Sequence, residues 1–256
     1  MMTIEQALAE MSALQEAYAA DTSQNQFKLL LCGHPGSGKT WFTHTAPTPI
    51  HYDSFDPGGT KAIRQFFGEN THIVDSRWEK EDREDPRAFQ VWLKEFNRRR
   101  SKGYFNHIAT YVLDSQTRFE RSGMNKILKD RGAAGSAPLW QKDYTPQKFE
   151  ILNAILKVVD LPCNVIVIAH LYPEYDDDGK IINYNIITTG QNRVDIPALF
   201  DEIWVMDPRE RSSGTEYRIR TQSTNLLTAR TRMPNLEAIE TLTLREMLEK
   251  GGFFNE

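Results

Sequence analysis

The sequence predicts one α/β core domain with a mainly parallel central sheet flanked by helices. Short apolar runs alternate with longer amphipathic stretches along the 256 residues, as in strands joined by crossover helices. The first such run leads into a glycine-rich loop and then a helix-forming stretch. A composition of 39% hydrophobic and 26% charged residues is typical of a folded chain. We expect an N-terminal helix and linker over 1–26, a core over 27–234, and a C-terminal tail with a short helix over 235–256.

The N-terminal stretch 3–20 is predicted to be a helix because its apolar residues repeat at intervals of three and four. These residues are Ile4, Ala7, Leu8, Met11, Leu14 and Tyr18. A polar stretch, 21–26, then separates this helix from the core. The apolar stripe must pack either on its own core or on a neighbouring subunit, and the pattern favours neither.

Short apolar or β-branched runs predict the strands of the core. They cover 27–32, 50–53, 71–75 (an edge strand), 108–113, 164–170, 203–206 and 217–221. Helical periodicity predicts helices that begin at Thr40, at 86 and beyond 115, the last interrupted by a loop at 132–136, and a further helix over 149–159. A hairpin over 174–189 turns at Asp178-Gly179, and a capping box at 243–246 opens a final helix that ends at Gly251.

The glycine-rich loop has the spacing of a phosphate-binding loop and lies between a predicted strand and a predicted helix. It consists of Gly33, His34, Pro35, Gly36, Ser37, Gly38, Lys39 and Thr40. Glycines let backbone N–H groups surround a phosphate, and a helix N-terminus favours the same anion. Lys39 is predicted to reach the β- and γ-phosphates of ATP, and Thr40 to offer its hydroxyl to Mg²⁺. The weaker alternative is a glycine-rich turn that binds no phosphate and contains Lys39 by chance.

Two polar residues end apolar strands downstream of this loop. Asp114 follows 108–113 and is predicted to hold Mg²⁺ or its water shell, the alternative being a carboxylate that caps a turn. His170 ends 164–170, where a parallel sheet opens toward its ligand, and can sense the γ-phosphate or orient water. The alternative for His170 is a surface histidine at a strand end.

Bulk properties restrict the remaining possibilities. A net charge of −4 and a pI near 5.9 exclude a strongly basic coat for nucleic acid, although a local basic groove stays possible. No apolar stretch approaches the roughly 18 to 20 residues that cross a bilayer, and the N-terminal residues do not resemble a signal peptide. Cys32 and Cys163 have no disulfide framework or metal-ligand spacing. We therefore expect a cytoplasmic protein without a membrane partner.

With these landmarks, the chain resembles the RecA-like P-loop ATPases from about Phe27 to Pro234. It is most similar to the short, single-core group carried by bacteriophages and linked to single-strand annealing and recombination. Besides the phosphate loop, the resemblance rests on segments 108–115, 143–144, 165–170, 190, 199–203 and 229–234. It implies an ATPase that assembles with copies of itself on single-stranded DNA in a bacterial host cell, with a single-strand-binding protein as a further candidate partner.

The resemblance also implies further site residues. A basic pair two residues apart reaches the ATP site of the next subunit in such proteins, and Arg230 and Arg232 stand at the matching positions, with arginine where this group usually has lysine first. A catalytic Glu is expected just past the second strand, but Phe55 occupies its position. Asp53 or Asp56 can substitute with a shorter side chain, so hydrolysis is expected to be slow.

DNA contacts are implied for two loops, 126–142 and 172–193. Their cationic and aromatic residues suit phosphates and stacked bases. They are Lys126, Lys129, Arg131, Trp140, Lys142 and Arg193. Three consecutive aspartates at 176–178 argue against the second loop.

Two other functions compete with a DNA-dependent ATPase. A small-molecule P-loop kinase would need a mobile lid with several arginines, and the sequence offers no obvious one. A nucleotide-dependent scaffold with little turnover is consistent with Phe55 at the position expected for the catalytic Glu.

Overall fold

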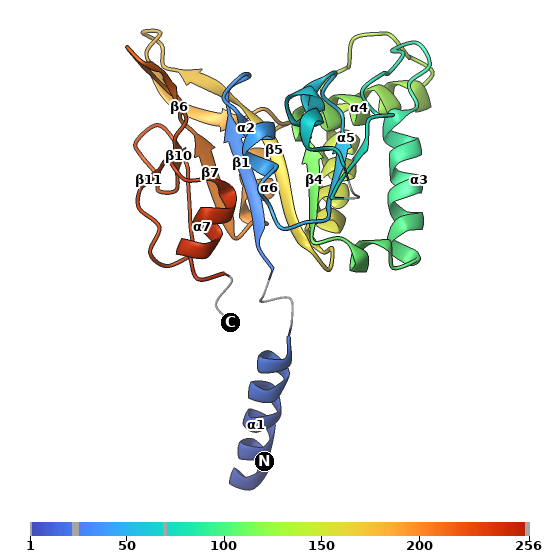
Figure 1. Cartoon of the computed structure of the whole chain (residues 1–256). Coiled ribbons are helices and arrows are strands. Elements are labelled where there is room, and N and C mark those ends of the chain that lie inside the picture. The colour runs from blue at the N-terminus through green and yellow to red at the C-terminus, as the bar shows by residue number, and fades with distance from the viewer. Residues whose placement is uncertain (1, 22–25, 69–70, 254–256) are drawn as a thin grey trace.

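The computed structural model describes residues 2–21, 26–68 and 71–253, and its core is a largely parallel sheet (Figure 1). Six strands run parallel in the order β7-β1-β5-β4-β2-β3. Strands β10 and β11 continue the sheet beyond β7 in the antiparallel sense. Strand β6 pairs with the far end of β5 as a hairpin. The predicted fold class, a mainly parallel α/β sheet flanked by helices with a hairpin and an N-terminal helix, is confirmed.

The strands of the sheet and the small hairpin have the following bounds. They are β1 (Lys28–Gly33), β2 (Ile50–Ser54), β3 (His72–Asp75), β4 (Thr110–Asp114), β5 (Asn164–Tyr175), β6 (Ile181–Ile186), β7 (Glu202–Met206), β8 (Arg209–Arg211), β9 (Gly214–Glu216), β10 (Ile219–Arg220) and β11 (Ile239–Glu240). The helices are α1 (Ile4–Ala20), α2 (Lys39–Thr43), α3 (Ala88–Ser101), α4 (Gln116–Asp130), α5 (Tyr144–Val159), α6 (Asn192–Ala198) and α7 (Leu244–Lys250). Two 3₁₀ helices, η2 (Gly59–Phe66) and η3 (Tyr104–His107), complete the described elements.

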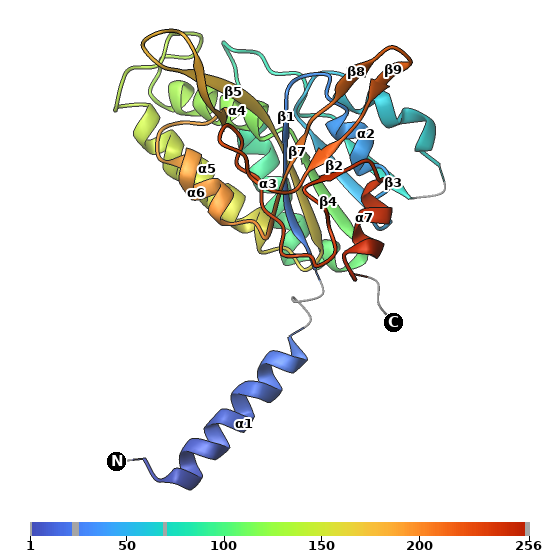
Figure 2. The ribbon, with the colours of Figure 1, turned by 90° about the vertical axis from the view of Figure 1, so that its left-hand side faces the viewer.

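Alternating side chains of the central strands build a core on each face of the sheet. From β1, Leu30 packs with the cluster under α3, α4 and α5, while Leu29 and Leu31 pack with the cluster under α2 and α7. All three leucines are fully buried. Figure 2 shows the sheet edge-on, with these two groups of helices on opposite sides. Because both faces are covered, β1 and the first half of β5 consist mainly of apolar residues, as their sequences predict.

Several elements differ in extent from the sequence prediction. Helix α2 has only five residues, so its dipole adds little to anion binding at the phosphate loop. Helix α5 begins at Tyr144 rather than 149, because Pro146 lies in its first turn, where proline is tolerated. Strand β5 extends to Tyr175 because its outer half pairs only with β6. The sequence reasoning missed α6, η2, β8, β9 and β11, which are short and lack a clear period.

Helix α1 stands apart from the core, on the side of the molecule where β1 begins (Figures 1 and 2). A capping box between Thr3 and Gln6 starts it, as its sequence permits. No residue of α1 is buried, and the exposed fractions of Ile4, Met11 and Leu14 are 82%, 58% and 65%. Of the two predicted docking modes, packing on its own core is not observed. Most of the predicted linker, residues 22–25, and the end of the tail, 254–256, lie outside the described residues.

No helix within residues 2–21, 26–68 and 71–253 is long and apolar enough to span a membrane. Both cysteines are buried free thiols, and burial raises the pKa of Cys32 to about 12 and that of Cys163 to about 11.

Candidate functional site

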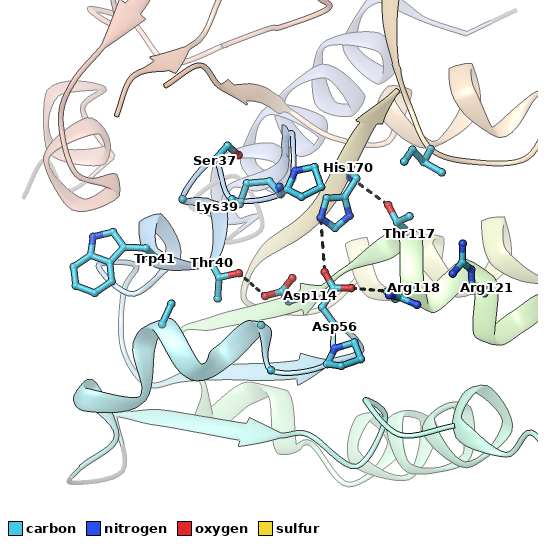
Figure 3. Close-up of a pocket in the computed structure, with 18 of the residues that line it drawn as sticks. Ser37, Lys39, Thr40, Trp41, Asp56, Asp114, Thr117, Arg118, Arg121 and His170 are labelled. Carbon is cyan, nitrogen blue, oxygen red and sulfur yellow. Dashed lines mark hydrogen bonds and ion pairs between the residues drawn. The ribbon is translucent and has the colours of Figure 1, made fainter. Parts of the chain in front are cut away.

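Four neighbouring strands deliver the candidate site to one edge of the sheet. Their order is β1-β5-β4-β2, and parallel strands end at the same edge. Gly33 pairs with His170 in register, and Asp114 pairs with Ile168 on one side and Ser54 on the other. The sheet therefore brings together four segments that are far apart in the sequence. They line a pocket of about 950 Å³ (Figure 3).

The phosphate loop connects β1 to α2 through glycines in left-handed conformations. Gly36 has φ +78° and Gly38 has φ +89°, values that residues with a Cβ rarely adopt. A Cβ on Gly38 would also lie 3.0 Å from the Tyr217 ring. The Lys39 Nζ atom donates hydrogen bonds to the backbone oxygens of Gly33 at 2.9 Å and His34 at 2.7 Å. The ammonium is thus held inside the loop, where a phosphate would compete for it.

Burial controls the protonation of the two charged groups at the base of the pocket. It lowers the pKa of Lys39 to about 8, and the nearby carboxylates of Asp114 and Asp56 offset only part of this effect. Burial also raises the pKa of Asp114 to about 6, against the hydrogen bond from Thr40. Each group would gain a counter-charge from a nucleotide–metal complex, because a triphosphate favours the ammonium and a cation favours the carboxylate.

Thr40 and Asp114 form the donor set expected for Mg²⁺. The Thr40 hydroxyl donates to Asp114 Oδ2 at 2.7 Å, so the two oxygens already lie side by side. Magnesium is commonly bound through one or two protein oxygens together with phosphates and water. The described residues hold no cluster of three or more His, Cys, Asp or Glu side chains suited to a metal. The site thus fits a metal that arrives with a nucleotide rather than a protein-only cage.

The position expected for a catalytic Glu contributes no carboxylate. Phe55 is 3% exposed and packs against Trp78, Trp92 and Phe119 on the face of the sheet covered by α3 and α4. The chain then turns, and the next residue, Asp56, enters the pocket. Its Oδ2 lies 3.8 Å from His170 Nε2.

Asp53, the other predicted substitute, does not line the pocket. It is fully buried on the α3 side of β2, where its carboxylate joins a network of hydrogen-bond donors. The donors are Trp78 Nε1 (3.1 Å), Trp92 Nε1 (2.8 Å), the Tyr111 hydroxyl (2.7 Å), His51 Nε2 (3.2 Å) and Arg99 (3.3 Å). Burial alone would raise the pKa of Asp53, but His51, Tyr111 and Arg99 together hold it well below its usual range. Its proposed catalytic role is therefore corrected to a structural one.

His170 lies at the junction of β5 and the pocket. Burial and the charge of Lys39 lower its pKa, so the imidazole is neutral near pH 7. Its backbone N–H donates to the Thr117 hydroxyl at 3.2 Å, which ties β5, at the point where its pairing with β1 stops, to the first turn of α4. His170 thus lines the same pocket as the phosphate loop, and its role toward a γ-phosphate stays a prediction.

Two arginines that the sequence reasoning did not select also line the pocket. Arg118 and Arg121 lie three residues apart on α4, and both point toward the site in Figure 3. The Arg118 Nε atom lies 3.5 Å from Asp56 Oδ1. A signal was available in the sequence, because a helix that begins right after Asp114 must present its first two turns to the same edge of the sheet.

Glu79 is a third residue that the sequence reasoning missed, and it fixes the loop that carries Asp56. Its carboxylate accepts hydrogen bonds from the Ser54 hydroxyl at 2.7 Å and from the Gly58 N–H at 2.9 Å. The loop after β2 is thus attached to the segment after β3. No sequence pattern announces this contact, because it depends on a tertiary turn.

Two half-exposed aromatic rings flank the phosphate loop. Trp41 is 45% exposed on α2, and Tyr217 is 51% exposed beside Gly38. Both rings line the main pocket and a smaller adjoining one of about 180 Å³. Such rings suit the face of a nucleobase.

Arg230 and Arg232 lie near the start of β7, and neither lines the pocket of its own chain. The Arg230 guanidinium donates to the backbone oxygens of Pro197 and Phe200. The Arg232 side chain is 65% exposed and pairs with Asp201 at 3.0 Å. A role in catalysis from these positions would have to be exerted on another subunit.

The residues predicted to bind DNA divide into two groups. Lys126 pairs with Asp130 and Glu150, Lys129 with Asp85, and Arg131 with Asp143, all at 2.6–2.9 Å. The other three residues, Trp140, Lys142 and Arg193, are exposed, and neither cation makes an ion pair with the described part of the chain. The intramolecular pairs make the first group poorer candidates for phosphate contacts.

The two predicted DNA loops meet across a cavity of about 800 Å³. Ser136 and Pro138 line it from the first loop, and Thr188 and Thr189 from the second. Arg118 and Arg121 belong to the walls of both this cavity and the phosphate pocket, so the two spaces adjoin.

A family model described as an AAA domain matches residues 25–233. No curated protein matches the chain. Solved structures that match include a KaiC-like protein from the hyperthermophilic archaeon Pyrococcus horikoshii, with 12% identity over 76% of this chain and 77% of that one, at a TM-score of 0.41. Another is a prototypical ATPase from the type III secretion system of pathogenic bacteria, with 12% identity, a TM-score of 0.42, and coverage of 71% of this chain but 51% of that one. At such scores the two structures carry no argument about activity.

Proposed function

This chain belongs to the AAA domain family and is, at the level of the family, a P-loop ATPase, and we propose a more specific function from this premise. The protein hydrolyses Mg–ATP while it acts on single-stranded DNA. The observation that carries the ATPase part is the convergence of four strand ends on the phosphate loop. The loop, the Thr40–Asp114 pair and Asp56 with His170 all line one pocket.

Each side chain has a role that its position supports. The phosphate-loop amides and Lys39 bind the β- and γ-phosphates, and Thr40 with Asp114 would hold Mg²⁺, which supplies charge neutralisation when bound. Asp56 accepts a hydrogen bond from the attacking water, and His170 orients that water or the γ-phosphate. Trp41 or Tyr217 stacks on the base. An aspartate in place of a glutamate predicts slow turnover.

The role on DNA rests on the exposed residues of the two loops and on the resemblance to the phage group. Trp140, Lys142 and Arg193 combine an aromatic ring with two exposed cations, which suits stacking and phosphate contacts on a flexible strand. The loops share walls with the nucleotide pocket through Arg118 and Arg121, which supports coupling between ATP and DNA.

Self-association completes this proposal. The unburied apolar stripe of α1 supports docking on a second copy of the chain. Arg232, exposed and remote from its own pocket, supports contact with the ATP site of a neighbour, with Arg230 beside it.

The test combines nucleotide binding with DNA stimulation. Full-length protein should bind ATP in a Mg²⁺-dependent manner, and Lys39→Ala should abolish that binding. Single-stranded DNA should raise the ATPase rate or the oligomer size, and Trp140→Ala/Lys142→Ala should reduce the effect. Mixing Lys39→Ala with Arg230→Ala/Arg232→Ala should restore some activity, because an interface between the two variants can combine an intact phosphate loop with an intact arginine pair. Absence of Mg²⁺-dependent ATP binding refutes the ATPase, whereas binding without any response to DNA refutes only the DNA role.

A nucleotide-dependent scaffold with little turnover is the second candidate, because Phe55 is buried where a catalytic carboxylate is expected. In that case ATP drives assembly and Lys39→Ala prevents it, while phosphate release stays negligible even with DNA present.

A further inference from the structure

Asp56 is held in the pocket by two loose contacts from opposite sides. Arg118 Nε lies 3.5 Å from Oδ1 and His170 Nε2 lies 3.8 Å from Oδ2, as the dashed lines in Figure 3 mark. Both separations exceed those of an ordinary hydrogen bond. The side chain of Arg118 is 46% exposed and that of Asp56 is 21% exposed, so water screens the pair. An ion pair of this kind contributes little and exchanges partners easily.

The backbone of Arg118 is much better fixed than its ion pair. It lies in the first turn of α4, directly after β4 and Asp114. The Ser115 hydroxyl caps this turn by accepting from the Arg118 N–H, and the Thr117 hydroxyl accepts from the His170 N–H in the middle of β5. The guanidinium therefore extends into the pocket from a fixed backbone position between β4 and His170.

A γ-phosphate would lie within reach of this guanidinium. Lys39 and Arg118 line the same pocket, and Figure 3 shows Asp56 and His170 between them. Under the proposed function, the loop and Lys39 bind the β- and γ-phosphates. A phosphate group offers arginine two parallel charge-assisted hydrogen bonds, which are stronger than one screened contact to a carboxylate. ADP lacks that group and would leave the pair in place.

We propose that Arg118 detects the γ-phosphate by binding it in place of Asp56. The released Asp56 carboxylate can then position the attacking water. This inference rests on the proposed ATPase function and adds to it a dependence of Asp56 on the nucleotide. Before ATP binds, Arg118 neutralises Asp56. After ATP binds, the guanidinium contacts the γ-phosphate, and the Asp56 carboxylate is available to accept a hydrogen bond from water.

The test compares full-length Arg118→Ala with wild type for a non-hydrolysable ATP analogue, for ADP and for turnover. Loss of bonds to a charged phosphate should reduce the preference for the analogue over ADP by roughly 10- to 100-fold, with ADP affinity nearly unchanged. Turnover should fall by about 10²- to 10³-fold. Arg118→Lys keeps the charge without the paired donors and should recover part of the preference. Arg98→Ala is the matched control, because Arg98 is 50% exposed and pairs with Glu95 on α3.

Asp56→Asn separates this exchange from a purely structural role of Arg118. It should lower turnover while keeping or increasing the preference for the analogue, because Arg118 no longer has a carboxylate to leave. The inference is overturned if Arg118→Ala keeps the wild-type preference, or if Asp56→Asn loses it to the same degree. If wild type binds neither ADP nor the analogue, the proposed ATPase itself fails. If wild type binds both and Lys39→Ala binds neither, the ATPase stands and the Arg118 result decides the inference alone.

Discussion

The substitution Asp53→Asn should lower the free energy of unfolding without changing any residue that lines the nucleotide pocket. The carboxylate is fully buried and accepts hydrogen bonds from Trp78, Trp92 and Tyr111, with Arg99 also in contact. An asparagine has nearly the same shape, but one of its two terminal atoms is an NH₂ donor. Whichever way the amide is turned, it presents that donor to another donor.

The size of the effect follows from counting what is lost. With the amide oxygen toward Trp92 and Tyr111, the buried Trp78 N–H loses its acceptor, at a cost of about 1–3 kcal/mol. Arg99 loses its contact with a negative charge at position 53 but keeps its bond to Asp75 at 2.6 Å. We therefore assign this loss about 1.5 kcal/mol, the lower limit for a hydrogen bond to a charged group. We therefore expect the free energy of unfolding to fall by about 2.5–4.5 kcal/mol, a large part of the roughly 5–15 kcal/mol of a typical domain.

The assay is urea denaturation at several pH values, followed by fluorescence or circular dichroism. Because the folded pKa of Asp53 is depressed, its contribution is fully present above its unfolded pKa of about 3.9 and is lost as the pH falls below that value. The gap between wild type and Asp53→Asn should thus be constant from about pH 5 to 7 and should narrow toward pH 3. Asp56→Asn is the control, with a change within about 1 kcal/mol because Asp56 makes only screened contacts.

One pattern of results would refute this reasoning. If Asp53→Asn unfolds at the wild-type urea concentration yet abolishes ATP turnover, Asp53 is the catalytic carboxylate and the structural role assigned to it is wrong.

Three other predictions follow from burial and charge. Burial lowers the pKa of Lys39 to about 8, and a bound triphosphate would raise it again. ATP affinity should therefore fall by up to about tenfold per pH unit above pH 8, and calorimetry in two buffers should detect proton uptake on binding. An ATP affinity that does not change between pH 7 and 10 would contradict this prediction. Because burial raises the pKa of Asp114 to about 6, the gain in ATP affinity on adding Mg²⁺ should shrink below pH 6, and Asp114→Asn should show a small gain at every pH. Leu30→Ala should cost about 2–5 kcal/mol of unfolding free energy and Leu14→Ala less than about 0.5 kcal/mol, since the first side chain is fully buried and the second is 65% exposed; equal losses would mean that α1 packs on the core.

The sequence was sufficient for features that depend on local pattern. Apolar runs of five or six residues identified the central strands, and the spacing of the phosphate loop identified Lys39 and Thr40. Asp114 and His170 were found because parallel strands end at one edge of the sheet, a rule that needs no contact information.

Contacts between distant segments could not be predicted in this way. Asp53 and Asp56 looked equivalent in the sequence, and only the alternation of β2 side chains, together with the indoles of Trp78 and Trp92, separates them. For Arg118, the sequence indicates only that α4 starts beside the pocket, and its contact with Asp56 depends on the loop after β2. The ion pair of Lys126 with Glu150 depends on the packing of α4 on α5, whereas its pair with Asp130 lies within α4.

The order of the central strands also constrains how the chain reaches its folded state. Gly33 finds its register partner at His170, and β5 must enter between β1 and β4 before the pocket exists. Such pairings close very long loops, which slows folding. A nucleotide can therefore bind only molecules whose central strands are already assembled. Its binding free energy should protect the amides of β1, β4 and β5 from hydrogen exchange more than those of the outlying β8–β9 hairpin.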